Sequence, residues 1–251
     1  MVLLLVVDLD PDLAALRPLG GFFVLRTEGT PAASLPTLAQ AYAHASPDVA
    51  HNPLLLRVRK VAKALRVPEP RVAASVAHQG LAARLWSIAL GCAALYGAVP
   101  DLDARLLRWD PDGSAPDDLW LSGVRPSPAD PDRLADAVLH GHLLPLEKAL
   151  RVHHRVAPGL LRGNAASALA GAGRELDRWA RRNGRAGLAA RASSLTAGLL
   201  AHPLLDGAGT LTGTAFRRRS CCLYYRVPGG GVCGDCCFPS APCSSPRAPS
   251  G

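Results

Sequence analysis

The sequence has few aromatic residues and only one cysteine, Cys92, in its first two hundred positions. Phe, Trp and Tyr make up 5% of the 251 residues, whereas hydrophobic residues as a whole make up 49%. Because the core of a β-sandwich is rich in aromatic and β-branched side chains, this composition argues against that class. Abundant Ala and Leu favour packed helices. The sequence therefore predicts a globular, mainly α protein.

No apolar run is long enough to cross a bilayer. The apolar, uncharged run over residues 85–100 falls short of the roughly 20 residues that a transmembrane helix needs. The N-terminal MVLLLVVDLDP lacks a preceding basic region, and Asp8 and Asp10 interrupt it too early for a secretory signal. We expect this segment to begin a strand or a helix. We also expect a cytoplasmic protein without a transmembrane segment, whose association with membranes is at most transient.

Two common binding functions also lack support. Gly171 and Gly173 are followed by Leu176 within a helical pattern, so no G-x-G-x-x-G turn follows a strand and no dinucleotide site is predicted. The formal charge of +8 is compatible with nucleic acid or anionic lipid, but the arginines are spread over helices and no helix-turn-helix is evident. We interpret the charge as solvated helix faces and expect no nucleic-acid partner.

Helical periodicity covers most of the chain. Residues 31–67 are predicted to form helices broken at prolines, and a longer helix from Pro70 places Cys92 in the interior as a small apolar residue. Periodicity returns over residues 131–201, with interruptions at Pro145, Pro158 and Asn183. Residues 106–109 and 119–121 flank the turn-rich DPDGSAPDD and predict a short β-hairpin. The fold class is therefore a helical domain with a short hairpin.

The cysteines follow the pattern C-C-x10-C-x2-C, formed by Cys221, Cys222, Cys233 and Cys236. In a reducing compartment such clusters usually bind metal, and four thiolates suit either Zn²⁺ or an iron-sulfur cluster. Adjacent residues in extended backbone point to opposite sides, so Cys221 and Cys222 do not easily chelate one tetrahedral ion. Spacing alone places an iron-sulfur cluster only modestly ahead of zinc.

Four arginines surround the first cysteine pair: Arg217, Arg218, Arg219 and Arg226. A [2Fe-2S] cluster with four thiolates is a dianion that becomes more negative on reduction, so nearby guanidinium groups stabilise its reduced form. For Arg217 and Arg218, a basic surface run without a redox role is an equally good interpretation.

Three segments resemble the FhuF-like siderophore-iron reductases: RRRSCCLYYRVPGGGVCGDCCF, RLWSIALGCAALYGAVP and RVAPGLLRGNAASALAGAGREL. The resemblance implies a [2Fe-2S] cluster on Cys221, Cys222, Cys233 and Cys236. Cys237, directly after the last of these, departs from the family pattern. The resemblance also implies a helical substrate-binding domain over residues 1–205 and a [2Fe-2S]-binding segment over residues 206–238. We expect residues 239–251 to form a disordered tail.

By this resemblance, the protein is an oxidoreductase that reduces Fe³⁺ in siderophores, mostly hydroxamates, and so releases Fe²⁺ in the cytoplasm. Its partners are the ferric siderophore and an electron donor of the ferredoxin or flavoprotein type. No catalytic residue is implied beyond the cluster ligands. Five further residues are candidates for supporting the cluster or contacting substrate: Arg219, Tyr224, Arg226, Asn164 and Trp86.

Other interpretations stay open at this point. The same four cysteines are compatible with a structural zinc in a non-enzymatic binding or regulatory module. An iron-sulfur regulator of DNA would use the positive charge, although the sequence shows no suitable DNA-binding motif. Four histidines lack partners at metal-ligand spacing apart from Glu147, and we expect them to be solvated or capping: His140, His142, His153 and His154.

Overall fold

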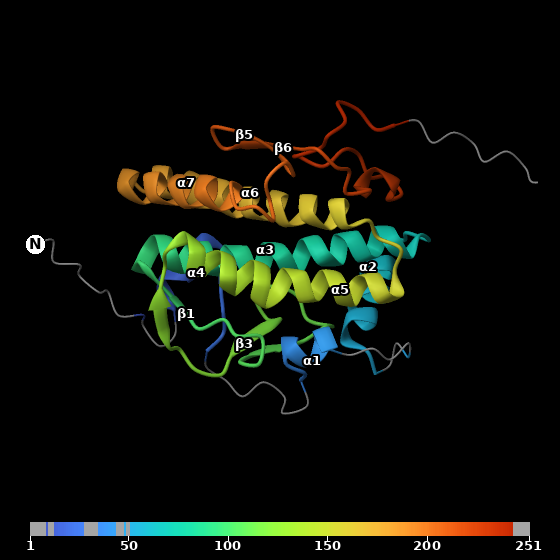
Figure 1. Ribbon diagram of the computed structural model, residues 1–251, viewed down its shortest axis with the longest axis horizontal. Coiled ribbons are helices and arrows are strands. Elements are labelled where there is room, and N and C mark those ends of the chain that lie inside the picture. Colours follow the sequence, from blue (N-terminus) through green and yellow to red (C-terminus); the bar gives the residue numbers. More distant parts are fainter. Residues whose placement is uncertain (1–8, 10–12, 28–34, 44–47, 49–50, 243–251) are drawn as a thin grey trace, which may run out of the picture.

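The computed structural model describes residues 9, 13–27, 35–43, 48 and 51–242. These residues form a mainly helical protein with small two-stranded sheets, as predicted (Figure 1). The helices are η1 (Ala14–Leu19), α1 (Leu38–Ala43), α2 (Pro53–Leu65), α3 (Pro70–Tyr96), α4 (Pro131–Ala135), η2 (Asp136–Leu143), α5 (Leu144–His153), α6 (Pro158–Arg182), α7 (Ala186–Leu200) and η3 (Tyr224–Arg226). The strands are β1 (Ala98–Pro100), β2 (Leu107–Trp109), β3 (Leu119–Leu121), β4 (Pro126–Pro128), β5 (Gly209–Thr212) and β6 (Ala215–Arg218).

Helix α3 is the centre of the fold. It begins with Pro70 at a helix N-terminal position and ends at Gly97, whose φ of 71° is left-handed and stops the helix. Its side chains are buried around the whole circumference, Cys92 among them, because α2, α6 and α7 pack against it. Figure 1 shows α6 and α7 on one side of α3 and the sheets of β1 and β3 on the other. Helix α6 thus separates α3 from the C-terminal segment over much of its length.

The predicted hairpin is confirmed. Strands β2 and β3 pair antiparallel, with Leu107 opposite Leu121 and Trp109 opposite Leu119. Two further pairs, β1 with β4 and β5 with β6, were not predicted. All four strands have only three or four residues, and β1 and β4 contain proline, so their sequences are too short or too irregular for a strand to be predicted.

The helical conformation continues through Pro145, where we expected an interruption. Helix η2 is a π-helix that leads directly into α5, and the Leu144 N–H donates to the carbonyl of Leu139. The wider turn accommodates a proline without ending the helix. His142 is buried in this helix, with Nε2 2.6 Å from the Leu102 carbonyl oxygen and Nδ1 3.0 Å from Tyr42 Oη. The prediction of a solvated or capping residue is therefore wrong for His142.

Strands β5 and β6 pack against α6, which brings the cysteine-rich segment onto the helical body (Figure 1). The N-terminal segment 1–8 and residues 243–251 of the tail lie outside the described residues, so our expectations for them are untested. The division at residue 205 also stays a prediction. Among the helices of the described residues, none combines the length and hydrophobicity that crossing a membrane requires.

Gly173 permits the close approach of α6 and α7. A Cβ at this position would lie 2.2 Å from Thr196 Oγ1, and Thr196 is held in place by donating to the Ala192 carbonyl. We expect Gly173→Ala to lower the free energy of unfolding by about 1–3 kcal/mol through overpacking.

Gly171→Ala is the matched control, because only the Arg174 side chain approaches its Cβ, at 3.8 Å. This change should be neutral or stabilise by up to about 1 kcal/mol through helix propensity. Urea unfolding measures both variants. Equal stability of the two would contradict the proposed helix contact.

Candidate metal centre

The cysteine loop, residues 221–237, follows β6. It then folds back, so that the Arg218 N–H at the end of β6 donates to the Asp235 carbonyl. Cys221 and Cys222 follow β6 after a bend, and Leu223 then takes a left-handed φ of 68° that leads into η3. A left-handed conformation costs a branched residue roughly 1–2 kcal/mol, so this turn is held by its surroundings. After a glycine-rich stretch, the Cys236 N–H donates to the Cys233 carbonyl at 3.0 Å and closes the second turn.

The thiols of the loop gather without forming a disulfide. The Sγ atoms of Cys222 and Cys233 lie 3.4 Å apart, although ten residues separate them in the sequence. This separation corresponds to a hydrogen bond between the two thiols. Within the described ranges, no three or more His, Cys, Asp or Glu side chains are grouped to hold a metal ion.

Backbone amides point at two other sulfurs of the cysteine loop. The Leu223 N–H donates to Cys221 Sγ at 3.2 Å, and the Phe238 N–H donates to Cys236 Sγ at 3.4 Å. Hydrogen bonds of this kind stabilise negative charge on sulfur and help to set the potential of an iron-sulfur centre. In both cases the donor follows its cysteine by two residues, so the two turns give their sulfurs the same type of hydrogen bond.

The thiols differ in acidity. The hydrogen bond with Cys233 lowers the pKa of Cys222 to about 6, and the same contact raises the pKa of Cys233. Burial raises the pKa of Cys221 to about 11. The positive charge of Arg218 lowers the pKa of both Cys222 and Cys233, because it favours thiolate. Of this hydrogen-bonded pair, Cys222 is therefore the thiol that ionises more readily.

Ser75 and Asn164, which are buried on α3 and α6, form a polar layer that contacts Cys222. Ser75 of α3 donates its hydroxyl to the Cys222 carbonyl at 2.8 Å. Asn164 of α6 donates its amide to the Ser75 carbonyl at 2.8 Å and is fully buried. Polar groups buried in this way are stable only when their hydrogen bonds are made, so the layer fixes the position of the loop relative to α3 and α6.

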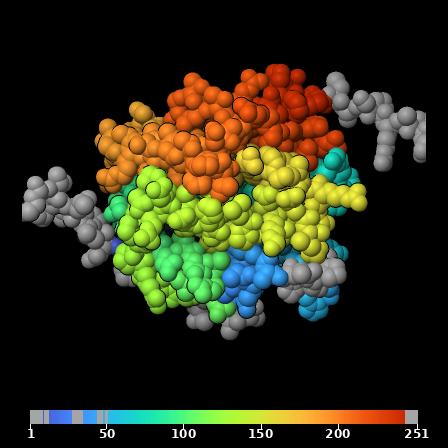
Figure 2. All heavy atoms as spheres, in the orientation of Figure 1, coloured from blue at the N-terminus to red at the C-terminus, as the bar shows by residue number. Residues whose placement is uncertain are grey.

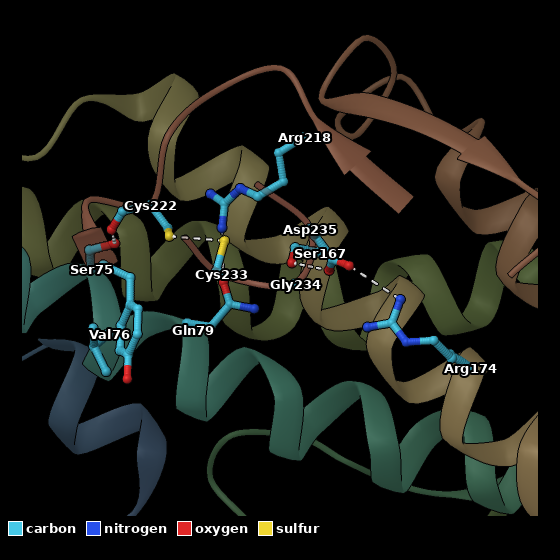
Figure 3. Close-up of a pocket in the computed structure, with 11 residues that line it drawn as sticks. Ser75, Val76, Gln79, Ser167, Arg174, Arg218, Cys222, Cys233, Gly234 and Asp235 are labelled. Atoms are coloured by element: carbon cyan, nitrogen blue, oxygen red, sulfur yellow. Dashed lines mark hydrogen bonds and ion pairs between the residues drawn. The ribbon is translucent and has the colours of Figure 1, made fainter. Parts of the chain in front are cut away.

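Arg218 lies between this layer and the thiols. Its guanidinium donates to Asn164 Oδ1 at 2.6 Å, to the Leu160 carbonyl at 3.2 Å and to the Ser220 carbonyl at 3.0 Å. A fourth contact places Nη1 3.4 Å from Gln79 Oε1. Arg218 is 3% exposed. Figure 3 shows its guanidinium pointing toward the Cys222 and Cys233 sulfurs, and all three residues line one cavity.

Asp235 anchors the second turn to α6. Its carboxylate accepts from Ser167 Oγ at 2.7 Å and from Arg174 Nη1 at 3.2 Å, and its backbone carbonyl accepts from the Arg218 N–H at 2.9 Å. The cavity beside it has a volume of about 310 Å³. Its lining combines α3, α6, β6 and both parts of the cysteine loop (Figure 3): Ser75, Val76, Gln79, Ser167, Arg174, Arg218, Cys222, Tyr224, Cys233, Gly234 and Asp235.

The structure brings some of the predicted supporting residues to the thiols and not others. Asn164 lies in the polar layer, and Tyr224 lines the cavity. Arg226 pairs with Glu69 at 2.8 Å, so a carboxylate offsets its charge. The Arg219 side chain is exposed, and Trp86 is buried in the helical core away from the cavity lining.

Several supporting residues were not predicted from the sequence. Ser75 and Gln79 lie in a helix whose sequence gives no sign of their role, and no pattern singled out Asp235. Arg218 was considered only as one of four arginines near the first cysteine pair, and its burial follows from strand alternation, in which residues two apart share a face. Phe216 and Arg218 are buried in β6 while Ala215 and Arg217 are exposed.

The donor set is suited to a thiolate-bound metal centre that carries negative charge. Thiols from two turns face one cavity, backbone amides point at sulfurs, and a buried guanidinium lies beside them. The cysteine loop also forms an outer face of the molecule, seen in red in Figure 2, where partners can reach it. These features are compatible with either an iron-sulfur cluster or a zinc ion on the cysteine loop.

The comparison with protein families agrees. Residues 218–238 match the family described as the FhuF 2Fe-2S C-terminal domain. This finding bears out the suspected resemblance in the C-terminal segment and the [2Fe-2S] cofactor, and it favours that cofactor over zinc. The matched segment is short, and the helical body lies outside it. No curated protein matches the chain.

Gly163 of α6 allows β6 and the cysteine loop to approach the helix. A Cβ there would lie 2.2 Å from Ser220 Oγ and 2.9 Å from Arg218 Nη2. We expect Gly163→Ala to displace both residues and to cause a severalfold faster reaction of the loop cysteines with a thiol reagent in metal-free protein.

Gly159→Ala is the control on the same helix, since a Cβ there would meet nothing within 4 Å. Its cysteines should react at the rate of the unchanged protein. Reaction of the Gly163 variant at that same rate would show that Arg218 and Ser220 do not depend on the glycine.

Proposed function

We propose that this protein reduces Fe³⁺ in siderophores by one electron, with Cys221, Cys222, Cys233 and Cys236 as the ligands of a [2Fe-2S] group. The observation that supports the proposal most strongly is the FhuF 2Fe-2S match over the cysteine loop. The reaction consumes one electron for each Fe³⁺ and yields Fe²⁺. A ferredoxin or flavoprotein in the cytoplasm supplies that electron.

The chemistry of the substrate makes reduction an efficient means of release. Siderophores bind Fe³⁺ through hard oxygen ligands, and these hold the softer, less charged Fe²⁺ much more weakly. When bound, a [2Fe-2S] group supplies a one-electron carrier suited to this step. The chelator is released intact, because only the metal changes its oxidation state.

The residues of the chain hold the electron carrier at the surface without leaving it fully exposed. Ser75, Asn164 and Asp235 fix the two turns, while Val76 and Tyr224 border the cavity on the side of α3. A bulky chelate and a donor protein can both approach the outer face in Figure 2 without entering the core. No proton-transfer residue is required for the electron step itself.

We expect the anaerobically reduced protein to be oxidised on mixing with a ferric hydroxamate siderophore, with one Fe²⁺ formed per electron lost. Visible absorption follows the protein, and a ferrous chelator that binds Fe²⁺ measures the product. The gallium(III) complex of the same siderophore is the control, because Ga³⁺ does not accept the electron. If the reduced protein is stable to every ferric siderophore tried, the proposed activity is wrong.

A second experiment tests the choice of ligand between Cys236 and Cys237. The turn closed by the Cys236 N–H brings Cys236 toward Cys233, and the thiol of Cys237 lies beside that of Cys236. Cys236→Ser should lose most of the cluster, because a hydroxyl is a poorer iron ligand than a thiolate. Cys237→Ser should leave the visible and EPR spectra nearly unchanged.

The double variant identifies rescue by the neighbouring thiol. If a distorted cluster persists in Cys236→Ser and disappears in the double variant, Cys237 has replaced the missing ligand. Full cluster loss in Cys237→Ser alone, with the fold intact by circular dichroism, would falsify the assignment of Cys236.

A further inference from the structure

The charge of Arg218 has no carboxylate partner among the described residues. Its guanidinium hydrogen bonds go to the Asn164 and Gln79 side chains and to the carbonyls of Leu160 and Ser220, which are all neutral. A guanidinium does not lose its proton in proteins, so the charge is permanent. A buried, permanent and unpaired charge is costly, and proteins keep one where an opposite charge is present in the working state.

The other charged groups near Arg218 have partners of their own or are neutral. Asp235, which lines the same cavity, places its carboxylate on Arg174 and Ser167. His78 is buried on α3, and burial, with the charge of Arg218 as a lesser cause, lowers its pKa to about 3. His78 is therefore neutral. The remaining candidates for a counter-charge are the cysteine thiolates, which share the cavity with Arg218.

The position of Arg218 is built into the fold. The alternation of β6 directs Arg218 inward and Arg217 outward, and Gly163 leaves space for the Arg218 Nη2 atom. The bonds of Arg218 reach α6 through Asn164 and α3 through Gln79. The guanidinium is thus fixed by both central helices and does not depend on the conformation of an exposed side chain.

We propose that Arg218 is the internal counter-charge of the cysteine loop, a positioning residue that favours the more negative, reduced form of the centre and raises its midpoint potential. This proposal rests on the proposed [2Fe-2S] function. It also assigns different roles to the neighbouring arginines. Arg217 and Arg219 are exposed and screened by salt, and Arg226 is offset by Glu69.

The test is a redox titration of the full-length protein, followed by EPR of the reduced state. In Arg218→Gln we expect the equilibrium constant for reduction to fall at least tenfold, a shift of about 59 mV to lower potential for one electron. Arg218→Lys keeps the charge and should stay close to the unchanged protein. Arg217→Gln is the matched control on the exposed face of the same strand and should shift less than Arg218→Gln.

The salt dependence of the potential shift distinguishes the effect of a buried charge from that of an exposed charge. Raising the ionic strength from about 0.1 M to about 1 M shortens the Debye length from about 10 Å to about 3 Å. The shift in Arg218→Gln should persist, whereas any shift in Arg217→Gln should disappear. An unchanged potential in Arg218→Gln, or equal shifts in Arg218→Gln and Arg218→Lys, would overturn the proposal.

A second variant keeps the test decisive if Arg218→Gln does not fold or bind the cluster. Gln79→Glu leaves Arg218 in place and adds a carboxylate about where Gln79 Oε1 lies, 3.4 Å from Nη1. We expect a tenfold or larger fall in the equilibrium constant for reduction. Gln40→Glu is its control, because Gln40 lies on α1 and hydrogen-bonds Thr37. Equal potentials in the two Glu variants would overturn the proposal.

Failure of the two proposals can be distinguished. A protein that contains no [2Fe-2S] centre after anaerobic purification contradicts the proposed function. A protein that contains the centre, but whose potential does not depend on residue 218, contradicts only the role of Arg218.

Discussion

The buried guanidinium of Arg218 is the interaction on which the cysteine loop depends. The Arg218 side chain extends from β6, contacts α6 and α3, and lies beside Cys222 and Cys233. A guanidinium has five donors in a rigid fork, so one side chain can satisfy acceptors from several segments at once. Without it, the carbonyls of Leu160 and Ser220 and the Asn164 side chain would lose a shared donor.

The helical body is shaped to receive this arginine. The neighbouring surface of α6 carries Gly163, Asn164 and Ser167, small or polar residues that leave space and supply partners. Ser75 and Gln79 provide the corresponding face of α3. The apolar faces of both helices pack into the core and support this polar surface. The cysteine loop is therefore held from one side by helices and stays accessible from the other.

The sequence predicted what repeated patterns encode. Apolar spacing identified α2, α3, α6 and α7, and the turn DPDGSAPDD identified the β2–β3 hairpin. The cysteine spacing alone left iron-sulfur only modestly ahead of zinc, and the family resemblance implied the [2Fe-2S] cofactor that the family match supports. Long-range polar contacts were not predictable in this way. Ser75 is 147 residues from its partner Cys222, and no local pattern marks that pairing.

The run of three arginines, Arg217 to Arg219, contains one buried and two exposed side chains, which have different effects on a nearby centre. Three successive arginines look equivalent in the sequence, yet strand alternation places only Arg218 inside. An exposed guanidinium is solvated and screened, so its effect on a nearby centre is weak and varies with salt. A buried guanidinium acts through a medium of low dielectric constant and from a fixed position. Tuning a potential favours the buried residue, whereas attracting a mobile partner favours the exposed ones.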